Sequence, residues 1–132
     1  MSEKKKFNAE YEMHASAKLL YPYLQTASGL SEWFADDVRI NPEKIHTFIW
    51  GTDQKKAIME SFRINHYVRF QFTDENGKTK QDPDYLELRL ETDDLTQLTY
   101  LKITDYSDFG DEEELEELWD DQISKLKSIV GG

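Results

Sequence analysis

The order of apolar and polar residues predicts β-strands along much of the chain. In residues 7–13 apolar side chains occupy the odd positions and polar ones the even positions, which is the two-residue period of a strand with one buried face. Residues 86–91 alternate leucine with charged residues in the same way. Four further runs are rich in β-branched and aromatic residues, and we expect strands at 45–50, 57–64, 66–72 and 96–104.

Polar segments with turn-forming residues separate these strands. Gly51 begins a turn through residues 52–54, and residues 93–94 mark another turn before the last strand. The Asn-Gly pair at 76–77 can adopt the positive φ angles of a tight turn. In the last strand Leu98 and Leu101 fall on opposite faces, which predicts a bulge or a strand covered on both sides.

Two short helices are predicted between the first strand and the rest of the sheet. Ser16 is a suitable N-cap for a helix whose apolar residues between positions 19 and 24 share one face. Pro22 lies inside this segment, so we expect the helix to be short or kinked. Ser28 is expected to cap a second helix that carries Trp33 and Phe34 into the core.

A long amphipathic helix is predicted at the C-terminal end. Asp111 with Glu114 three residues later resembles a capping box, and Gly131-Gly132 should end the helix. Acids in the first turns and lysines in the last suit the helix dipole. About nineteen residues at a rise of ~1.5 Å give a length of ~28 Å. We expect this helix to cross the sheet and bury Leu115, Trp119, Ile123, Leu126 and Val130.

Together these elements predict an α+β fold. A strand, two short helices, a series of strands and a long helix, in that order, indicate a curved antiparallel sheet that grips the C-terminal helix. The chain has 132 residues and neither a repeat nor a linker, so we expect a single domain over residues 1–132. Aromatic side chains between sheet and helix either pack solid or leave a cavity for a ligand.

Composition narrows the classes of partner. The net charge of −11 argues against nucleic acid and against an anionic membrane surface, because both attract basic proteins. No run of about 18 apolar residues is present, so we expect no membrane span. The N-terminal residues 1–6 are charged and have no apolar segment behind them, unlike a secretory signal. The sequence contains no cysteine, which fits a cytoplasmic location.

Several segments resemble a known family. In similar proteins Ser-Pro often stands where this chain has Ser16-Ala17, followed by a Leu-x-x-Trp turn, here Leu30 to Trp33. The segments 48–51 and 118–119 also fit. With the order of elements, they resemble the START-like superfamily, which has the helix-grip fold of the birch-pollen allergen and polyketide cyclases. The similarity is to the branch homologous to activators of the heat-shock-protein-90 ATPase, and it implies a fold more strongly than an activity.

Motifs for catalysis or metal binding are not evident. His14, His46 and His66 lack the spacing of zinc ligands, so we interpret them as surface or strand residues and expect neither a metal nor another cofactor. Residues 105–108 resemble a calcium-ligand cluster but lack the spacing and closing Glu of an EF-hand. Residues 36–37 are either an acid pair or, as we favour, a solvated loop. No nucleophile, phosphate-binding or dinucleotide motif occurs.

The aromatic residues are the best candidates for a site. Pockets for small ligands are mostly apolar with a few placed polar groups, and a packed core is the alternative interpretation for each residue. The candidate cavity walls are Trp33, Phe34, Trp50, Phe62, Phe70, Phe72, Tyr85, Trp119 and Ile123. The candidate polar anchors are Arg63, His66 and Arg69, with Arg89 in a similar position, although each is more often an outward-facing charge.

Three function classes remain open at this point. The first, which we favour, is a domain that binds a small hydrophobic or amphipathic molecule. The second is a protein-interaction domain that acts as a chaperone cofactor, as the resemblance implies. The third is an enzyme of the cyclase or hydrolase kind, which no motif supports. A cavity of several hundred Å³ would favour the first, a solid core the second, and a pocket with a perturbed carboxylate or histidine the third.

Overall fold

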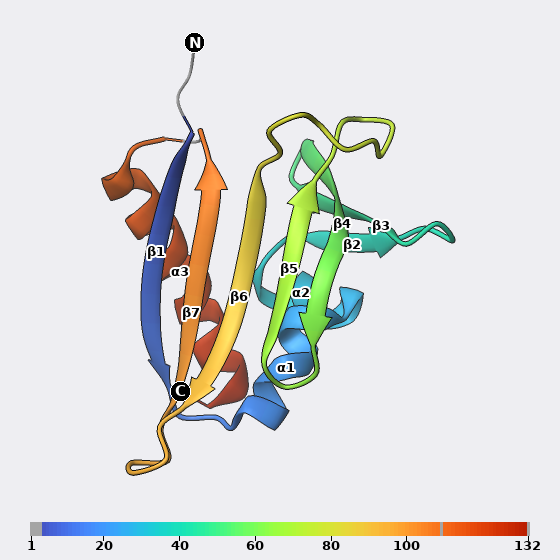
Figure 1. The fold of residues 1–132 in the computed structure, drawn as a ribbon. Coiled ribbons are helices and arrows are strands. Elements are labelled where there is room, and N and C mark those ends of the chain that lie inside the picture. The colour runs from blue at the N-terminus through green and yellow to red at the C-terminus, as the bar shows by residue number, and fades with distance from the viewer. Residues whose placement is uncertain (1–3, 109, 132) are drawn as a thin grey trace.

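A computed structural model describes residues 4–108 and 110–131. Seven strands form one antiparallel sheet in the order β1-β7-β6-β5-β4-β3-β2. All three helices lie on the same face of this sheet (Figure 1). The elements are β1 (Lys5–Met13), α1 (Ala17–Gln25), α2 (Ala27–Trp33), β2 (Asp37–Ile40), β3 (Ile45–Trp50), β4 (Asp53–Arg63), β5 (Tyr67–Phe72), β6 (Tyr85–Thr92), β7 (Thr99–Ser107) and α3 (Glu112–Val130). The predicted α+β fold with a helix gripped by a curved sheet is confirmed.

The long helix α3 begins and ends as its sequence predicts. The Asp111 carboxylate accepts a hydrogen bond from the backbone N–H of Glu114 at 2.9 Å, and the Glu114 side chain accepts from the N–H of Asp111 at 3.4 Å. Gly131 adopts the left-handed conformation with φ of 91°, which glycine reaches without a steric penalty. The second glycine of the predicted stop, residue 132, lies outside the described residues, as do residues 1–3 of the N-terminal segment.

The core lies between the helices and the inner face of the sheet. Of the five α3 residues expected there, four are buried and Val130 is half-buried. Leu86, Leu88 and Leu90 of β6 are also buried, as their alternation with charged residues predicts. Among the described residues, no helix is long and apolar enough to cross a membrane.

The second short helix starts two residues earlier than predicted. Thr26, rather than Ser28, is the N-cap of α2: its hydroxyl accepts from the N–H of Gly29 at 2.9 Å and donates to the carbonyl of Pro22 at 2.8 Å. A Cβ atom at Gly29 would lie 2.3 Å from that same carbonyl oxygen. The close approach of α1 and α2 therefore requires glycine at this position. α1 is short, as Pro22 predicts.

The main differences from the predicted strands concern β2, β4 and β7. The four-residue strand β2 was not predicted, and it pairs with β3. β7 runs from Thr99 to Ser107, so Leu98 precedes the strand. The apolar side chain of Leu98 therefore requires neither a bulge in β7 nor a strand covered on both faces. The shift in register occurs instead in β4, between Met59 and Ser61. β4 also begins at Asp53, which places residues expected in a turn on the sheet.

Candidate functional site

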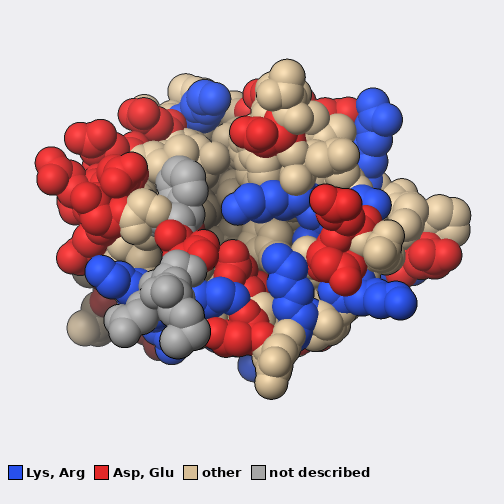
Figure 2. All heavy atoms as spheres, turned by 90° about the horizontal axis from the view of Figure 1, so that it is seen from above, with Lys and Arg blue, Asp and Glu red and all other residues tan. Residues whose placement is uncertain are grey.

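A pocket of about 520 Å³ opens between the sheet and α3. Its lining residues come from the C-cap of α2, the end of β3, the start of β4, the entry into β6, the ends of β5 and β7, and the middle of α3. Seen from that end of the molecule, the surface is hollowed, with uncharged residues inside the hollow and charged residues around its edge (Figure 2). The pocket therefore lies between the sheet and the closing helix.

Four aromatic side chains form much of the pocket wall, and all four belong to the predicted set. Phe34 stands at the C-terminal end of α2 and contacts aromatic side chains of β3 and α3. Its ring lies 5.5 Å from that of Trp50 on β3 and 5.9 Å from that of Trp119 on α3. Phe72 on β5 completes the set. Such ring pairs contribute about 0.5–1.5 kcal/mol each beyond the area they bury.

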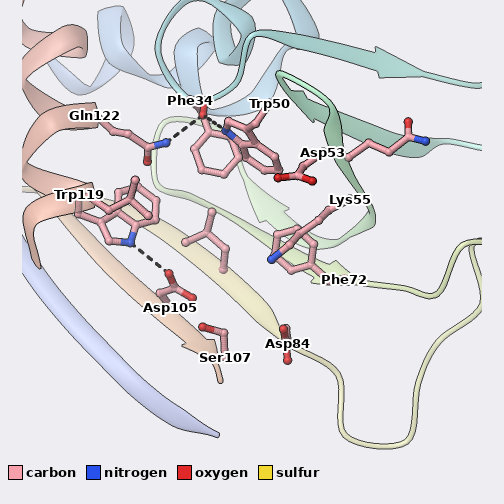
Figure 3. Close-up of a pocket in the computed structure, with 13 residues that line it drawn as sticks. Phe34, Trp50, Asp53, Lys55, Phe72, Asp84, Asp105, Ser107, Trp119 and Gln122 are labelled. Atoms are coloured by element: carbon pink, nitrogen blue, oxygen red, sulfur yellow. Dashed lines mark hydrogen bonds between the residues drawn. The ribbon is translucent and has the colours of Figure 1, made fainter. Parts of the chain in front are cut away.

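Hydrogen bonds to the carbonyl of Phe34 connect three elements at the pocket edge. As the C-cap residue of α2, Phe34 has a carbonyl without a partner within the helix. It accepts hydrogen bonds from Trp50 Nε1 at 2.8 Å and from Gln122 Nε2 at 3.0 Å (Figure 3). These two bonds join α2, β3 and α3, and they hold the Trp50 and Gln122 side chains in one orientation.

The most unusual polar group in the pocket is the carboxylate of Asp105. Leu101 and Ile103 on β7 face the core, so Asp105, two residues further along, faces inward as well. It accepts a hydrogen bond from Trp119 Nε1 at 3.1 Å (Figure 3) and another from Ser107. Burial raises the pKa of the Asp105 carboxyl above its ordinary value of 3.8, and these hydrogen bonds partly oppose that rise.

The remaining charged groups stand nearer the pocket edge. Lys55 is exposed, and its Nζ lies 5.8 Å from the centre of the Phe72 ring. Asp84 forms an ion pair with Lys4 at 2.8 Å. Asp53 and Gln54 are exposed at the start of β4. The pocket thus combines an apolar wall with the half-buried carboxylate of Asp105 and a charged rim.

Gln122 also contributes an acceptor. Its Nε2 donates to Phe34, whereas its Oε1 is buried and has no hydrogen-bond partner among the described residues. A flipped amide would set Oε1 against the Phe34 carbonyl oxygen, so that two acceptors would face each other. The hydrogen bond to Phe34 therefore fixes which atom is left unpaired.

The other predicted wall residues lie elsewhere. Phe70 and Ile123 are buried in the core, and Trp33 lines a smaller neighbouring cavity of about 240 Å³. Phe62 pairs with the buried Val68, yet its side chain is 52% exposed near the β4–β5 turn. Tyr85 lies on the outer face of the sheet, where its ring stacks on that of Tyr106 at 5.2 Å.

The three predicted anchors do not reach the pocket. Arg69 lies between the inward-facing Val68 and Phe70, so its side chain is on the outer face. There it binds Glu60 at 3.3 Å and Glu87 at 3.5 Å, and its guanidinium lies 3.9 Å from the centre of the Tyr85 ring. Arg63 is exposed at the end of β4, and His66 is exposed in the following turn. Arg89 is also on the outer face, over the ring of Tyr67 at 4.5 Å.

His46 and the acid pair at 36–37 do not line this pocket. His46 is 4% exposed on β3, and burial lowers its pKa, so the imidazole is neutral at pH 7. Its ring packs 5.3 Å from that of Phe70. Asp36 accepts from the N–H of Gly51 at 2.7 Å, and Asp37 begins β2. Within the described ranges, 4–108 and 110–131, no group of three potential metal ligands is found.

The sequence prediction named none of the polar lining residues as part of a pocket. Residues 105–108 were considered only as a calcium-ligand cluster beyond the end of the last strand, although Asp105 continues the alternation of Leu101 and Ile103, which was the available signal. Asp53 and Lys55 share the parity of the buried Ala57, but they were assigned to a turn and its edge. The lining residues that the prediction missed are Asp53, Gln54, Lys55, Asp84, Leu86, Asp105, Ser107, Leu118 and Gln122.

Comparisons with known proteins agree with this architecture. A family model described as a START-like superfamily domain matches residues 1–132. The solution structure of protein BfR322 from Bacteroides fragilis is similar, with 36% sequence identity, a TM-score of 0.64, and coverage of 96% of this chain and 91% of that one. No curated protein matches the chain.

Two more distant structures share the fold. The Aha1 dimer from Colwellia psychrerythraea has a TM-score of 0.72 at 17% identity, covering 96% of each chain. Protein MLL2253 from Mesorhizobium loti has a TM-score of 0.75 at 11% identity, covering 96% of this chain and 97% of that one. At these identities the likeness concerns the fold alone.

Proposed function

The chain belongs to the START-like superfamily, and from that premise we propose that residues 1–132 form a single domain that binds a small hydrophobic or amphipathic molecule in the pocket between the sheet and α3. START-like domains bind small ligands or protein partners. The observation that carries the proposal is the pocket of about 520 Å³ with four aromatic residues on its wall. Ligand pockets typically measure about 300–1,000 Å³ and are lined by such side chains.

The polar groups of the pocket favour binding over catalysis. A carboxylate with a raised pKa can serve as a general acid or base, and Asp105 has that property. However, its hydrogen-bond partners are the indole of Trp119 and the hydroxyl of Ser107, and no histidine lines the pocket in the described part of the chain. We therefore assign Asp105 the role of a ligand anchor. The absence of cysteine supports a proposed cytoplasmic location.

A protein-interaction role, as a chaperone cofactor, is the second candidate. The first turns of α3 carry exposed acids from Glu112 to Glu117, and acidic side chains gather on one side of the pocket end in Figure 2. Such a surface attracts basic partners and raises their rate of association. The shared fold with the Aha1 dimer is compatible with this role and does not distinguish it from ligand binding.

A pair of tryptophan substitutions on α3 tests the ligand-binding proposal. Leu118 is 40% exposed and lines the pocket, whereas Ile129 is 38% exposed on the same helix and does not. Leu118→Trp should fill the pocket, and Ile129→Trp is the matched control. Naphthylmethanol, a neutral planar probe, should raise the melting temperature of the wild type and of Ile129→Trp but not of Leu118→Trp.

The expected stabilisation follows from mass action. Ligand at a hundredfold excess over its dissociation constant stabilises the folded state by about 2.7 kcal/mol. The emission of Trp50 and Trp119, which line the pocket, should shift in parallel. An equal rise in the melting temperature of Leu118→Trp would place binding elsewhere. The absence of any rise across naphthylmethanol, fatty acids and aromatic metabolites would refute the proposal and leave the interaction role as the better account.

A further inference from the structure

The interior of the pocket offers a ligand hydrogen-bond acceptors rather than donors. Gln122 Oε1 is buried without a partner among the described residues, and its direction is set by the bond from Nε2 to Phe34. A buried unpaired acceptor costs folding free energy unless water or a ligand supplies a donor. This oxygen has almost no accessible surface in the structure, so a ligand reaches it only if neighbouring side chains shift.

The Asp105 carboxylate adds a charged acceptor to the same pocket. A carboxylate has about four acceptor positions, so the bonds from Trp119 and Ser107 leave it able to accept from a ligand. Figure 3 shows Asp105 and Gln122 on either side of Trp119, from β7 and α3 respectively. Hydrogen bonds between ionised partners are about twice as strong as neutral ones, so an ammonium would be the best complement to Asp105.

Two cations stand near the pocket opening, and the charge of one of them, Lys55, acts to lower the pKa of the Asp105 carboxyl. Lys55 is exposed beside the Phe72 ring, and Lys4 already forms an ion pair with Asp84 at 2.8 Å. The lining residues include three aspartates against the single Lys55. An anionic ligand could place its charged group at Lys55 beside Phe72, but the carboxylates of Asp53, Asp84 and Asp105 line the same pocket and would repel it.

The aromatic wall and the surrounding field also favour a cation. The faces of Trp50 and Trp119 carry negative partial charge and attract ammonium groups within about 6 Å of the ring centre. The chain has a net charge of −11, and exposed acids of α3 stand beside the opening. Charge of one sign around a cleft raises the local concentration of the opposite charge.

Resting on the proposed ligand-binding function, we propose that the preferred ligand is a planar apolar molecule that carries an ammonium or a similar N–H donor. Its ring system would lie against Phe34, Trp50 and Trp119. Its donor group would bind the carboxylate of Asp105. Charge would then select the ligand, in addition to hydrophobic burial.

Three naphthalene probes with different head groups test the ligand class. Naphthylmethylamine is a cation at neutral pH, naphthylmethanol is a neutral molecule with the same number of heavy atoms, and naphthoate is an anion. Dissociation constants would be measured by tryptophan fluorescence and by calorimetry at low and moderate salt. We expect the amine to bind about tenfold or more tightly than the alcohol, and naphthoate to bind more weakly than either.

Two aspartate substitutions test whether Asp105 causes the preference for the amine over the alcohol. Asp105→Asn keeps an oxygen that can accept from Trp119 and removes the charge in the pocket. Asp94→Asn removes one charge in the turn between β6 and β7, at the opposite end of the sheet from the pocket (Figure 1). The preference for the amine over naphthylmethanol should fall about tenfold in Asp105→Asn and persist in Asp94→Asn.

The outcomes separate the two proposals. If naphthylmethanol binds and the amine binds no better, or if naphthoate binds best, the ligand class is wrong and the pocket function stands. If Asp105→Asn retains the full amine preference, the assignment of Asp105 is wrong. If none of the three probes binds the wild type, the ligand class is overturned, and the pocket function is overturned as well when fatty acids and aromatic metabolites also fail to bind. The ranking in the wild type does not depend on how well either variant folds.

Discussion

Trp119→Ala is the substitution that best tests the packing of α3 against the sheet. The Trp119 side chain is 2% exposed. Its ring lies 6.4 Å from that of Trp33 and 5.9 Å from that of Phe34, and its Nε1 donates to Asp105. Truncation to alanine removes these contacts at once and leaves a cavity beside the pocket.

The expected loss can be worked out from these contacts. A buried tryptophan removes about 150–250 Å² from water, which at about 25 cal/mol per Å² corresponds to roughly 4–6 kcal/mol. Alanine retains a small part of that burial, and measured Trp→Ala changes in cores fall at about 3–5 kcal/mol. Asp105 also loses a donor, but water in the open pocket can replace it. We therefore expect a loss of about 4 kcal/mol.

Urea unfolding followed by circular dichroism measures this loss, with Leu118→Ala as the control. Leu118 precedes Trp119 on the same helix and is 40% exposed, so its truncation should cost less than about 1 kcal/mol. A loss below about 1 kcal/mol for Trp119→Ala would show that α3 is not docked on the sheet through this residue.

Three further predictions concern the cap, the pocket carboxylate and the acidic end. Asp111→Ala should lower the free energy of unfolding by about 1 kcal/mol in urea, whereas Glu112→Ala beside it should cost much less. The pKa of Asp105 in the folded state is raised above 3.8, so ionisation of this carboxyl disfavours the folded state. The stability of the wild type relative to Asp105→Asn should therefore fall as the pH rises from 3.8 through the folded-state pKa of Asp105. A constant difference in urea midpoints over that pH range would contradict this. Ten acids and no base lie between Asp105 and Asp121, so the melting temperature should rise from low salt to ~0.1 M salt, where the screening length is ~10 Å; a steady fall would mean that attractive pairs dominate.

Local signals account for the parts of the fold that the sequence predicts. The capping box at Asp111, the alternation from Leu86 to Leu90 and the proline in α1 each act within a few residues. The strand β2 has only four residues and exists through its pairing with β3, which a local pattern does not reveal. The choice of Thr26 over Ser28 as a cap likewise depends on the contact with Pro22 in the preceding helix.

The wall of the pocket was easier to predict than its polar groups. Phe34, Trp50, Phe72 and Trp119 line the pocket, as expected for large apolar side chains at the junction of sheet and helix. The anchors were sought among cations on strands, but Arg69 alternates with buried neighbours and must face outward. The end of β7 was placed three residues too early, and this concealed the inward direction of Asp105.

The pocket also shows why core and site residues are hard to separate from sequence. Phe70 and Phe72 lie two residues apart on the same face of β5, yet Phe70 is fully buried and Phe72 lines the opening. Their difference arises from position relative to the end of the sheet, which depends on the register of β4, β5 and β6 together. Residue type and periodicity are the same for both.

Native mass spectrometry of gently purified protein tests the central claim most directly, namely that the pocket between the sheet and α3 holds a small molecule. We predict a bound species, either co-purified or formed with added naphthylmethylamine, on the wild type and on Ile129→Trp, and its loss from Leu118→Trp. Ligand-free protein alone under all these conditions, or equal occupancy of Leu118→Trp, would contradict the account.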